Sequence, residues 1–550
     1  MENSSVTASG DNVPVDPPAQ KADRGWRFWA VFACLALTAF LSSLEGSIVS
    51  TALPSIARAL QAGENYIWAV NVYFLTSAAV QPVYGQLADL WGRRWPMIGA
   101  VAIFTLGSGI CGGATSTNML IGGRAVQGLG AAGINMLVEL ILCDLLPLRE
   151  RGQFMGLLFV FIILGSVLGP FLGGILVDRV SWRWAFYINL PFGGASLILL
   201  YLVLHVQHRS QDNFYKKVKQ IDFIGNFILA ASVASVLYAL TYGGTKYEWS
   251  HASIIISLVL GLLGHVLFGV FEASRFCPQP VMPAALFANR TSAVGFIATF
   301  LQTLVSYWGL YFLPVYFQST QLVSPTRSGV QLLPFSAVYS FSALIGGAIV
   351  SKLGRFRVVH FAAFALMTIG LGTFTLFDRD TPMAMWVILQ MIFALGLGII
   401  MPCLLTAIQA SLPDSLNAAS TGAFAFVRSI GTIWGVSIPA AIFNTRFDQL
   451  LPTLPDAGTR EALSHGQAYQ SASESLINSF PATIRSGVIA IYEQSLERVW
   501  QIGIVFAGVG FLLIFLEKDL KLRTEHGDQE FGLADANGSK TNEEQAEKQL

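Results

Sequence analysis

Five ionisable side chains lie inside long apolar runs of the sequence: Glu45, Arg124, Glu139, His265 and Arg428. An ionised side chain costs about 3 kcal/mol or more at the centre of a bilayer, so each of them is a candidate functional residue. A carboxylate can take up and release a proton, and a neighbouring guanidinium favours its ionised form. The chemistry that these residue types indicate is reversible proton binding. Glu139 is expected near the end of its helix, and His265 is expected to be a hydrogen-bonded histidine away from any solute pathway.

The sequence lacks the patterns of common catalytic and nucleotide-binding sites. No GxxxxGK[ST] phosphate loop occurs, which argues against an ATP-driven pump. No Ser/His/Asp, metal-binding or paired-carboxylate arrangement is evident either. The cysteines are too widely spaced to indicate a disulfide framework or a metal site, and they are Cys34, Cys111, Cys143, Cys277 and Cys403. We therefore expect no enzyme activity, no cofactor and no metal.

The composition is that of a membrane protein. Hydrophobic residues make up 53% of the 550 residues and charged residues only 12%, against roughly 25% charged residues in soluble domains. The mean hydropathy is +0.57. Lys and Arg (33) balance Asp and Glu (33), so nothing indicates a nucleic-acid partner.

Apolar runs separated by Gly, Pro and charged residues predict about fourteen transmembrane helices. The even number places both termini on one side of the membrane. Short loops on that side hold 13 Lys and Arg and those opposite hold 6, which predicts that both termini are cytoplasmic. Polar tails, expected to be disordered, occupy residues 1–27 and 517–550, and a polar extracellular loop is expected at 444–497.

A repeat relates the two halves of the chain. GQLADLWGRR begins at Gly85 and GAIVSKLGRF begins at Gly347, an offset of 262 residues, and the same offset joins Gly169 to Gly431 and Gly173 to Gly435. Two six-helix bundles are therefore predicted, at 28–206 and 291–516, with a cytoplasmic linker and two inserted helices at 207–290. Parallel halves that meet at a midplane cavity are a transporter architecture, in which one half rocks against the other.

Several motifs resemble those of the major facilitator superfamily, and within it the fourteen-span drug:proton antiporters of fungi and bacteria. The resemblance covers nearly all of residues 29–516. Glu45 stands where many members have Asp, and Leu90 where members often have a basic residue. The motifs are LEGSIVSTALP (44–54), GQLADLWGRR (85–94), IGGRAVQGLGAAG (121–133), WRWAFYINLPFG (182–193) and YFLPVYFQ (311–318). The resemblance implies the all-α major facilitator fold.

The segment GSVLGPFLGG (165–174) resembles the fifth-span motif associated with antiporters. Gly165, Gly169 and Gly173 are four residues apart, so they share one helix face on which a second backbone can pack closely. Pro170 frees a carbonyl and bends the helix, and Gly174 follows the last glycine of the face. We expect this face to press against the opposite bundle.

Three further groups of residues are expected to act in transport. Gly85, Asp89, Gly92 and Arg93 would form a charged latch, in which a tight Gly92 turn brings Arg93 within reach of Asp89 or of a neighbouring helix end. Arg428, with Gly431 and Gly435 beside it, is expected to act in gating. The expected lining of the substrate cavity comprises Asn71, Tyr73, Gln127, Gln302, Trp308 and Tyr311.

Glu45 and Arg124 are expected to meet at one depth in the membrane. The first span runs outward and Glu45 lies about six residues before its outer end, whereas the fourth runs inward and Arg124 lies about six residues after its own. At 1.5 Å per residue the two depths agree. Parting the pair would favour protonation of the carboxylate, because burial disfavours its charged form. The alternative is a static ion pair that fixes the two helices.

These observations favour a plasma-membrane exporter that exchanges small hydrophobic drugs, toxins or secondary metabolites for protons and works as a monomer. One alternative is a vacuolar transporter of basic amino acids, which resembles the same family. An acidic cavity would favour it, yet the spans contain few carboxylates beyond Glu45 and Glu139. A second alternative is a non-transporting membrane sensor, which usually has a large folded tail.

Overall fold

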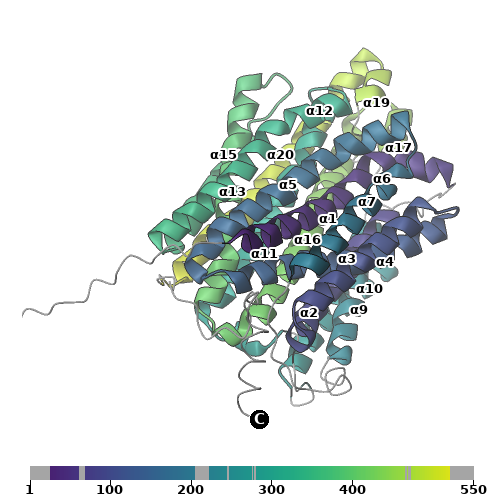
Figure 1. Cartoon of the computed structure of the whole chain (residues 1–550). Helices are drawn as coiled ribbons and strands as arrows, with labels where there is room; N and C mark the ends of the chain where they lie inside the picture. The colour runs from purple at the N-terminus through teal and green to yellow at the C-terminus, as the bar shows by residue number, and fades with distance from the viewer. Residues whose placement is uncertain are drawn as a thin grey trace, which may run out of the picture.

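The computed structural model describes residues 25–60, 68–204, 222–243, 247–274, 282–464 and 474–518, with the single residues 277, 280, 468, 472 and 520. Over these ranges every regular element is a helix, which confirms the predicted all-α fold. Most helices run roughly along one direction through the molecule (Figure 1).

The first bundle contains the helices up to Val203. They are α1 (Trp26–Ala59), α2 (Trp68–Trp91), α3 (Arg94–Gly112), α4 (Thr117–Leu145), α5 (Leu148–Arg179), α6 (Trp184–Tyr187) and α7 (Asn189–Val203). The inserted pair comprises α9 (Phe223–Tyr242) and α10 (Ala252–Glu272). These two helices pack on each other, and α9 also packs on α2, so the pair lies beside the first bundle (Figure 1).

The second bundle begins after the short helix η2 (Ala284–Leu286). Its helices are α11 (Arg290–Ser319), α12 (Pro325–Gln331), α13 (Leu333–Leu353), α14 (Arg357–Phe374), α15 (Met383–Ala410), α16 (Asn417–Leu450) and α20 (Ala482–Leu513). The short helices α17 (Ala457–Leu463) and α19 (Glu474–Ser479) lie between α16 and α20.

Twelve helices of the described residues are long and apolar enough to cross a membrane, and each coincides with a predicted span. The other two predicted spans correspond to α2 and α9, whose apolar stretches, Val72–Gln81 and Phe223–Ala239, are shorter than a full crossing. Two of the predicted spans, near 184–206 and 328–351, are each divided, α6 from α7 and α12 from α13. Pro191 and Pro334 follow these breaks by a few residues, where the missing N–H of proline is tolerated at a helix start.

Much of the polar segment at 444–497, predicted as an extracellular loop, is helical. Helix α16 continues to Leu450 and α20 begins at Ala482. The predicted ends followed the limits of the apolar runs, whereas helical hydrogen bonding continues into polar sequence once the helix leaves the hydrocarbon region.

The internal repeat is visible in equivalent helix contacts. Helix α5 packs on α1 as α16 packs on α11, and α4 packs on α2 as α15 packs on α13. The turns after α2 and α13 place Gly92 and Gly354 at φ 79° and 64°, a left-handed conformation that favours glycine. Because these glycines are 262 residues apart, the sequence offset corresponds to a repeated turn.

The bundles meet along α5 with α13 and along α2 with α16. Figure 1 shows α1, α5 and α13 side by side. An added Cβ at Gly156 would lie 2.6 Å from Ala343 O, and one at Gly347 would clash with Gly152 O. We call the side where α1 begins and α20 ends the terminal side. Gly152 lies near the start of α5 and Gly347 near the end of α13, so the two backbones are in close contact towards this side.

Candidate functional site

A buried ion pair joins α1 to α4 inside the first bundle. Arg124 Nη1 lies 2.7 Å from Glu45 Oε1, and both side chains are 0% exposed. The pairing expected from their equal depth is therefore present. Transferring two charges out of water is costly, and the pair is retained only with good geometry and further hydrogen bonds.

Neighbouring polar groups from three other helices complete this site. Asn189 Nδ2, at the start of α7, donates to Glu45 Oε2. Arg124 Nη1 also donates to Gln127 Oε1 at 2.7 Å, and Gln127 Nε2 donates to Ser108 Oγ of α3 at 2.7 Å. The Arg124 guanidinium lies 4.2 Å from the centre of the Tyr73 ring of α2. Both carboxylate oxygens of Glu45 are thus hydrogen-bonded, and Arg124 has a second acceptor and an aromatic face.

This arrangement can hold a proton reversibly. With Arg124 in place the carboxylate of Glu45 is stabilised in its ionised form by the opposite charge and by the Asn189 amide. A shift of α4 relative to α1 would remove the opposite charge, and the low-dielectric surroundings would then favour the neutral acid. Gln127 can keep Arg124 hydrogen-bonded during such a shift because both lie on α4.

A second ion pair crosses between the bundles. Arg428 Nη2 of α16 lies 2.6 Å from Glu139 Oε1 of α4, and the two side chains are 18% and 1% exposed. The Arg428 guanidinium also lies 5.5 Å from the ring centre of Phe159 of α5. Next to it, Ser429 Oγ donates to Gln81 Oε1 of α2 at 2.9 Å. Both charged residues were singled out by the sequence, but their pairing was not expected because spacing does not show which helices of the two halves touch.

The loop after α2 forms its charged contact with the end of α4. Arg93 Nε lies 2.7 Å from Asp144 Oδ2, and Arg93 Nη1 donates to Ala88 O at 2.8 Å. The partner of Arg93 is therefore the end of a neighbouring helix, which was one of the two contacts predicted for it. Gly92 forms the turn between α2 and α3. The side chain of Asp89 lies outside the described residues. Asp144 was missed, although an acid in the last turn of the fourth span was visible in the sequence.

The glycines of the fifth-span motif pack within their own bundle, so the expected contact with the opposite bundle was wrong. An added Cβ at Gly165 would lie 2.6 Å from Phe40 O, and one at Gly169 would lie 2.9 Å from both Ile48 N and Leu44 O, all on α1. Gly173 is buried, while the surroundings of Pro170 and Gly174 are not among the described features. The glycines of α5 that contact the opposite bundle are the earlier Gly152 and Gly156.

Gly431 and Gly435 repeat this packing in the second bundle. An added Cβ at Gly431 would lie 2.9 Å from Phe300 O, and one at Gly435 would lie 2.9 Å from Leu304 Cα, both on α11. These glycines therefore hold α16 close to α11, and Arg428 on the same helix reaches the first bundle.

The residues expected to line a cavity lie in several different surroundings. Tyr73 and Gln127 belong to the Glu45 site, and Gln302 is buried on α11 with Nε2 3.4 Å from Leu397 O. Trp308 is fully buried against Phe506 of α20, with ring centres 5.5 Å apart. The side chain of Asn71 lies outside the described residues.

Two tyrosines stack on each other along α11, one helical turn apart. Tyr311 is 39% exposed, and its ring stacks on that of Tyr307 with centres 6.2 Å apart. Tyr307 lies within electrostatic range of Tyr73 in the first bundle and of Tyr339 on α13. Tyr307 and Tyr339 were missed by the sequence reasoning, although Tyr307 precedes Tyr311 by one helical turn.

The remaining sequence candidates behave as structural groups. His265 Nδ1 lies 2.7 Å from Gly261 O, as expected of a hydrogen-bonded histidine. All five cysteines are buried and free. Cys277 was expected to stand apart from other ligands, yet its sulfur and one carboxylate oxygen each of Asp222 and Glu272 lie within 4.8 Å of one another. Backbone N–H groups of Gly225 and Met282 donate to one oxygen of each carboxylate.

Comparison with known proteins identifies the family that has this architecture. A profile of the Major Facilitator Superfamily matches residues 35–436. Among solved structures, the human organic anion transporter MFSD10 superposes with a TM-score of 0.56 at 14% identity, covering 89% of this chain and 100% of its own. The proton:xylose symporter XylE superposes with a TM-score of 0.55 at 13% identity, covering 90% and 98%. These low identities establish the shared fold alone.

The chain belongs to the Major Facilitator Superfamily and is a multi-pass membrane transporter, not an enzyme. Within the family it is similar to fungal proteins named for efflux. It is 65% identical to the MFS-type efflux transporter pyiT of Pyricularia grisea, over 96% of this chain and 91% of that protein. It is 48% identical to the MFS-type efflux transporter ffsH of Aspergillus flavipes (98% and 93% covered) and 47% identical to the MFS efflux transporter aclA of Aspergillus oryzae (93% and 92% covered).

Proposed function

We propose that the protein exports a small hydrophobic molecule, such as a toxin or secondary metabolite, in exchange for protons by alternating access. The observation that carries this proposal is the Glu45–Arg124 pair, a fully buried titratable site in the core of one bundle of a two-bundle transporter. Export as the direction of transport is supported by the relatives of nearly equal length that are named efflux transporters.

Proton coupling requires that solute and proton binding depend on the same movement. Tyr73 contacts the Arg124 guanidinium and lies within electrostatic range of Tyr307 in the opposite bundle. A solute bound between the bundles beside Tyr307 can therefore shift Tyr73 and Arg124. If Arg124 moves away from Glu45, the carboxylate takes up a proton, and the return of Arg124 expels it.

The polar groups near the bundle interface are suited to an uncharged or weakly polar solute. Tyr307, Tyr311, Tyr339 and Gln302 offer aromatic surface with a few hydrogen-bonding groups. Glu45 and Glu139, the carboxylates that could attract a basic amino acid, are each paired with an arginine. This pairing disfavours the alternative of a vacuolar transporter of basic amino acids.

The proposed cargo can be sought by comparing cells with and without the protein. Untargeted mass spectrometry of medium and cell extracts should find a small set of hydrophobic metabolites that cells lacking the protein retain. Vesicles with the protein should then concentrate the retained compound when a pH gradient is imposed. Equal partition of every metabolite in the two strains would contradict export.

The inter-bundle ion pair should stabilise the conformation that is closed on the terminal side. Removing one partner of a buried ion pair costs about 3–5 kcal/mol, which is enough to make a minor open state predominate. We expect Arg428→Gln and Glu139→Gln each to lengthen the distance between spin labels at Trp95 and Leu353, which are exposed at terminal-side ends of the first and second bundles. The native cysteines are buried, which favours selective labelling.

A charge reversal supplies the control for this experiment. The double variant Glu139→Arg with Arg428→Glu restores the opposite charges, so it should return the label distance towards that of the parent. An unchanged distance between the labels in both single variants would contradict the proposal that the Glu139–Arg428 pair stabilises this closed conformation.

We propose further that both termini are cytoplasmic, on the basis of the 13 to 6 distribution of Lys and Arg. We also propose that the protein lies in the plasma membrane, where an exporter releases its solute from the cell. Ser471, which lies outside the described residues between α17 and α19, is a suitable position for an inserted tag. A tag there should react with impermeant reagents on intact cells, and a tag at either terminus should not. Labelling of both termini from outside would contradict this orientation. A fluorescent tag would distinguish the plasma membrane from the vacuole.

A further inference from the structure

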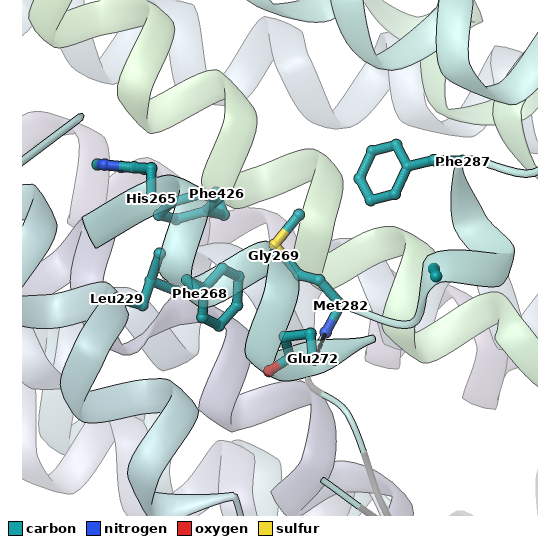
Figure 2. Close-up of a pocket in the computed structure, with 9 residues that line it drawn as sticks. Leu229, His265, Phe268, Gly269, Glu272, Met282, Phe287 and Phe426 are labelled. Atoms are coloured by element: carbon teal, nitrogen blue, oxygen red, sulfur yellow. Dashed lines mark hydrogen bonds between the residues drawn. The ribbon is translucent and has the colours of Figure 1, made fainter. Parts of the chain in front are cut away.

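A pocket of about 310 Å³ lies outside the two-bundle interface, between the inserted helices and the second bundle. Figure 2 shows Phe268 and Gly269 of α10 on one side and Phe426 of α16, Met282 and Phe287 on the others. The volume is at the lower end of the range of about 300–1,000 Å³ for ligand sites. Because the walls are mainly apolar, water would find few hydrogen-bonding partners inside.

The pocket is partly open to the outside of the molecule beside α10. Phe287 of its lining is 43% exposed, and the same helix carries the exposed apolar side chains Val266, Leu267 and Val270 outside the lining. Gly269 is exposed as well, and an added Cβ there would meet no atom within 4 Å. In a membrane, hydrocarbon chains are the surrounding solvent of these side chains.

Polar groups close one end of the pocket at the boundary of the hydrocarbon region. Glu272 is the last residue of α10 and its Oε2 accepts a hydrogen bond from Met282 N at 3.0 Å (Figure 2). His265, at the other end, lies seven residues earlier, which corresponds to about 10 Å along a helix. The pocket is therefore an apolar slot that runs from head-group depth into the hydrocarbon.

We propose that this pocket binds one acyl chain of a membrane phospholipid from the leaflet on the terminal side. The open mouth, the apolar walls and the polar end at head-group depth match an acyl chain whose head group remains at the surface. The transported solute is a less suitable occupant, because α9 and α10 lie outside the two bundles between which a cargo would pass.

A lipid bound here would contact a helix that takes part in bundle movement. Phe426 lies two residues before Arg428, which pairs with Glu139 of the first bundle. Movement of α16 relative to α10 would change the size of the pocket. Lipid occupancy is therefore expected to depend on the conformation of the transporter.

The proposal can be tested by photocrosslinking the full-length protein in nanodiscs made of a phospholipid with a diazirine on one acyl chain. Mass spectrometry should find labels concentrated on peptides that contain Phe268, Phe287 and Phe426. Gly269→Trp should reduce this labelling about tenfold, because the indole would occupy volume that the acyl chain needs. The substitution is compatible with folding because Gly269 has open space around it.

Gly508→Trp on α20 is the matched control, because an added Cβ at Gly508 also meets no atom within 4 Å. It should leave the labelling of the pocket unchanged, and gel filtration should show both variants folded. Labels spread evenly over all exposed apolar faces and insensitive to Gly269→Trp would contradict the proposal. Displacement of the label by the exported compound would also contradict it, since the pocket would then belong to the solute pathway.

Discussion

Glu45→Gln is expected to abolish uphill transport while leaving solute binding measurable. A proton that moves through about 100 mV and one pH unit supplies roughly 2.3 + 1.4 kcal/mol, enough to sustain a solute gradient of a few hundredfold. Gln keeps the shape of the side chain, and its oxygen can accept from Arg124 while its amide N–H donates to Asn189 Oδ1 once that amide is flipped, but it has no titratable proton. Vesicles with this variant should therefore reach only equal concentrations of the exported compound on the two sides.

Two further variants separate loss of coupling from loss of folding. Glu461→Gln makes the same change on the exposed surface of α17 and should transport like the parent. Because Glu45→Gln leaves the charge of Arg124 uncompensated, it can cost about 3–5 kcal/mol of stability. The double variant Glu45→Gln with Arg124→Gln removes both charges, so it should be more stable and equally uncoupled. Solute gradients equal to those of the parent in Glu45→Gln or in the double variant would exclude Glu45 as the coupling residue.

Gly169→Leu is expected to leave membrane insertion intact and to reduce transport severely. The new side chain would meet Ser47 Oγ as well as the α1 backbone at Leu44 and Ile48, and backbone cannot move aside as a flexible side chain can. Overpacking of about 1–3 kcal/mol or more changes the balance between conformations by about 5- to 150-fold. Initial rates of proton-driven uptake into vesicles, normalised to the amount of protein, measure the effect.

Gly99→Leu on α3 is the control for this substitution, because an added Cβ at Gly99 would meet no atom within 4 Å. It should transport at the rate of the parent. If Gly169→Leu does so too, then close packing of α5 on α1 is not needed for the transport cycle.

Much of the fold could be predicted because lipid leaves few options for the backbone. Apolar runs of sufficient length must be helices in a membrane, and the repeat at a constant offset indicated two related bundles. The positive φ angles of Gly92 and Gly354 show why that motif carries glycine in both halves. The helical extensions beyond the bilayer were not predictable from hydropathy, because polar sequence permits helix and loop alike.

Within the candidate site, the sequence predicted only the contact that follows from the depth of two residues in the membrane. Glu45 and Arg124 could be paired because the positions of both in their spans were known. The pairing of Glu139 with Arg428 depends on how the bundles pack, and the partner of Gly165 and Gly169 depends on which way α5 faces. A row of glycines shows that a helix packs closely, but it does not show on which neighbour.

The central claim, that solute export is coupled to proton entry through Glu45, is tested most directly in vesicles that enclose a pH-sensitive dye. A gradient of the exported compound alone, with no imposed pH difference, should drive protons across the membrane in the opposite direction. This proton flux should be present with the parent and absent with Glu45→Gln. Movement of the compound by the parent protein with no accompanying proton flux would contradict the account.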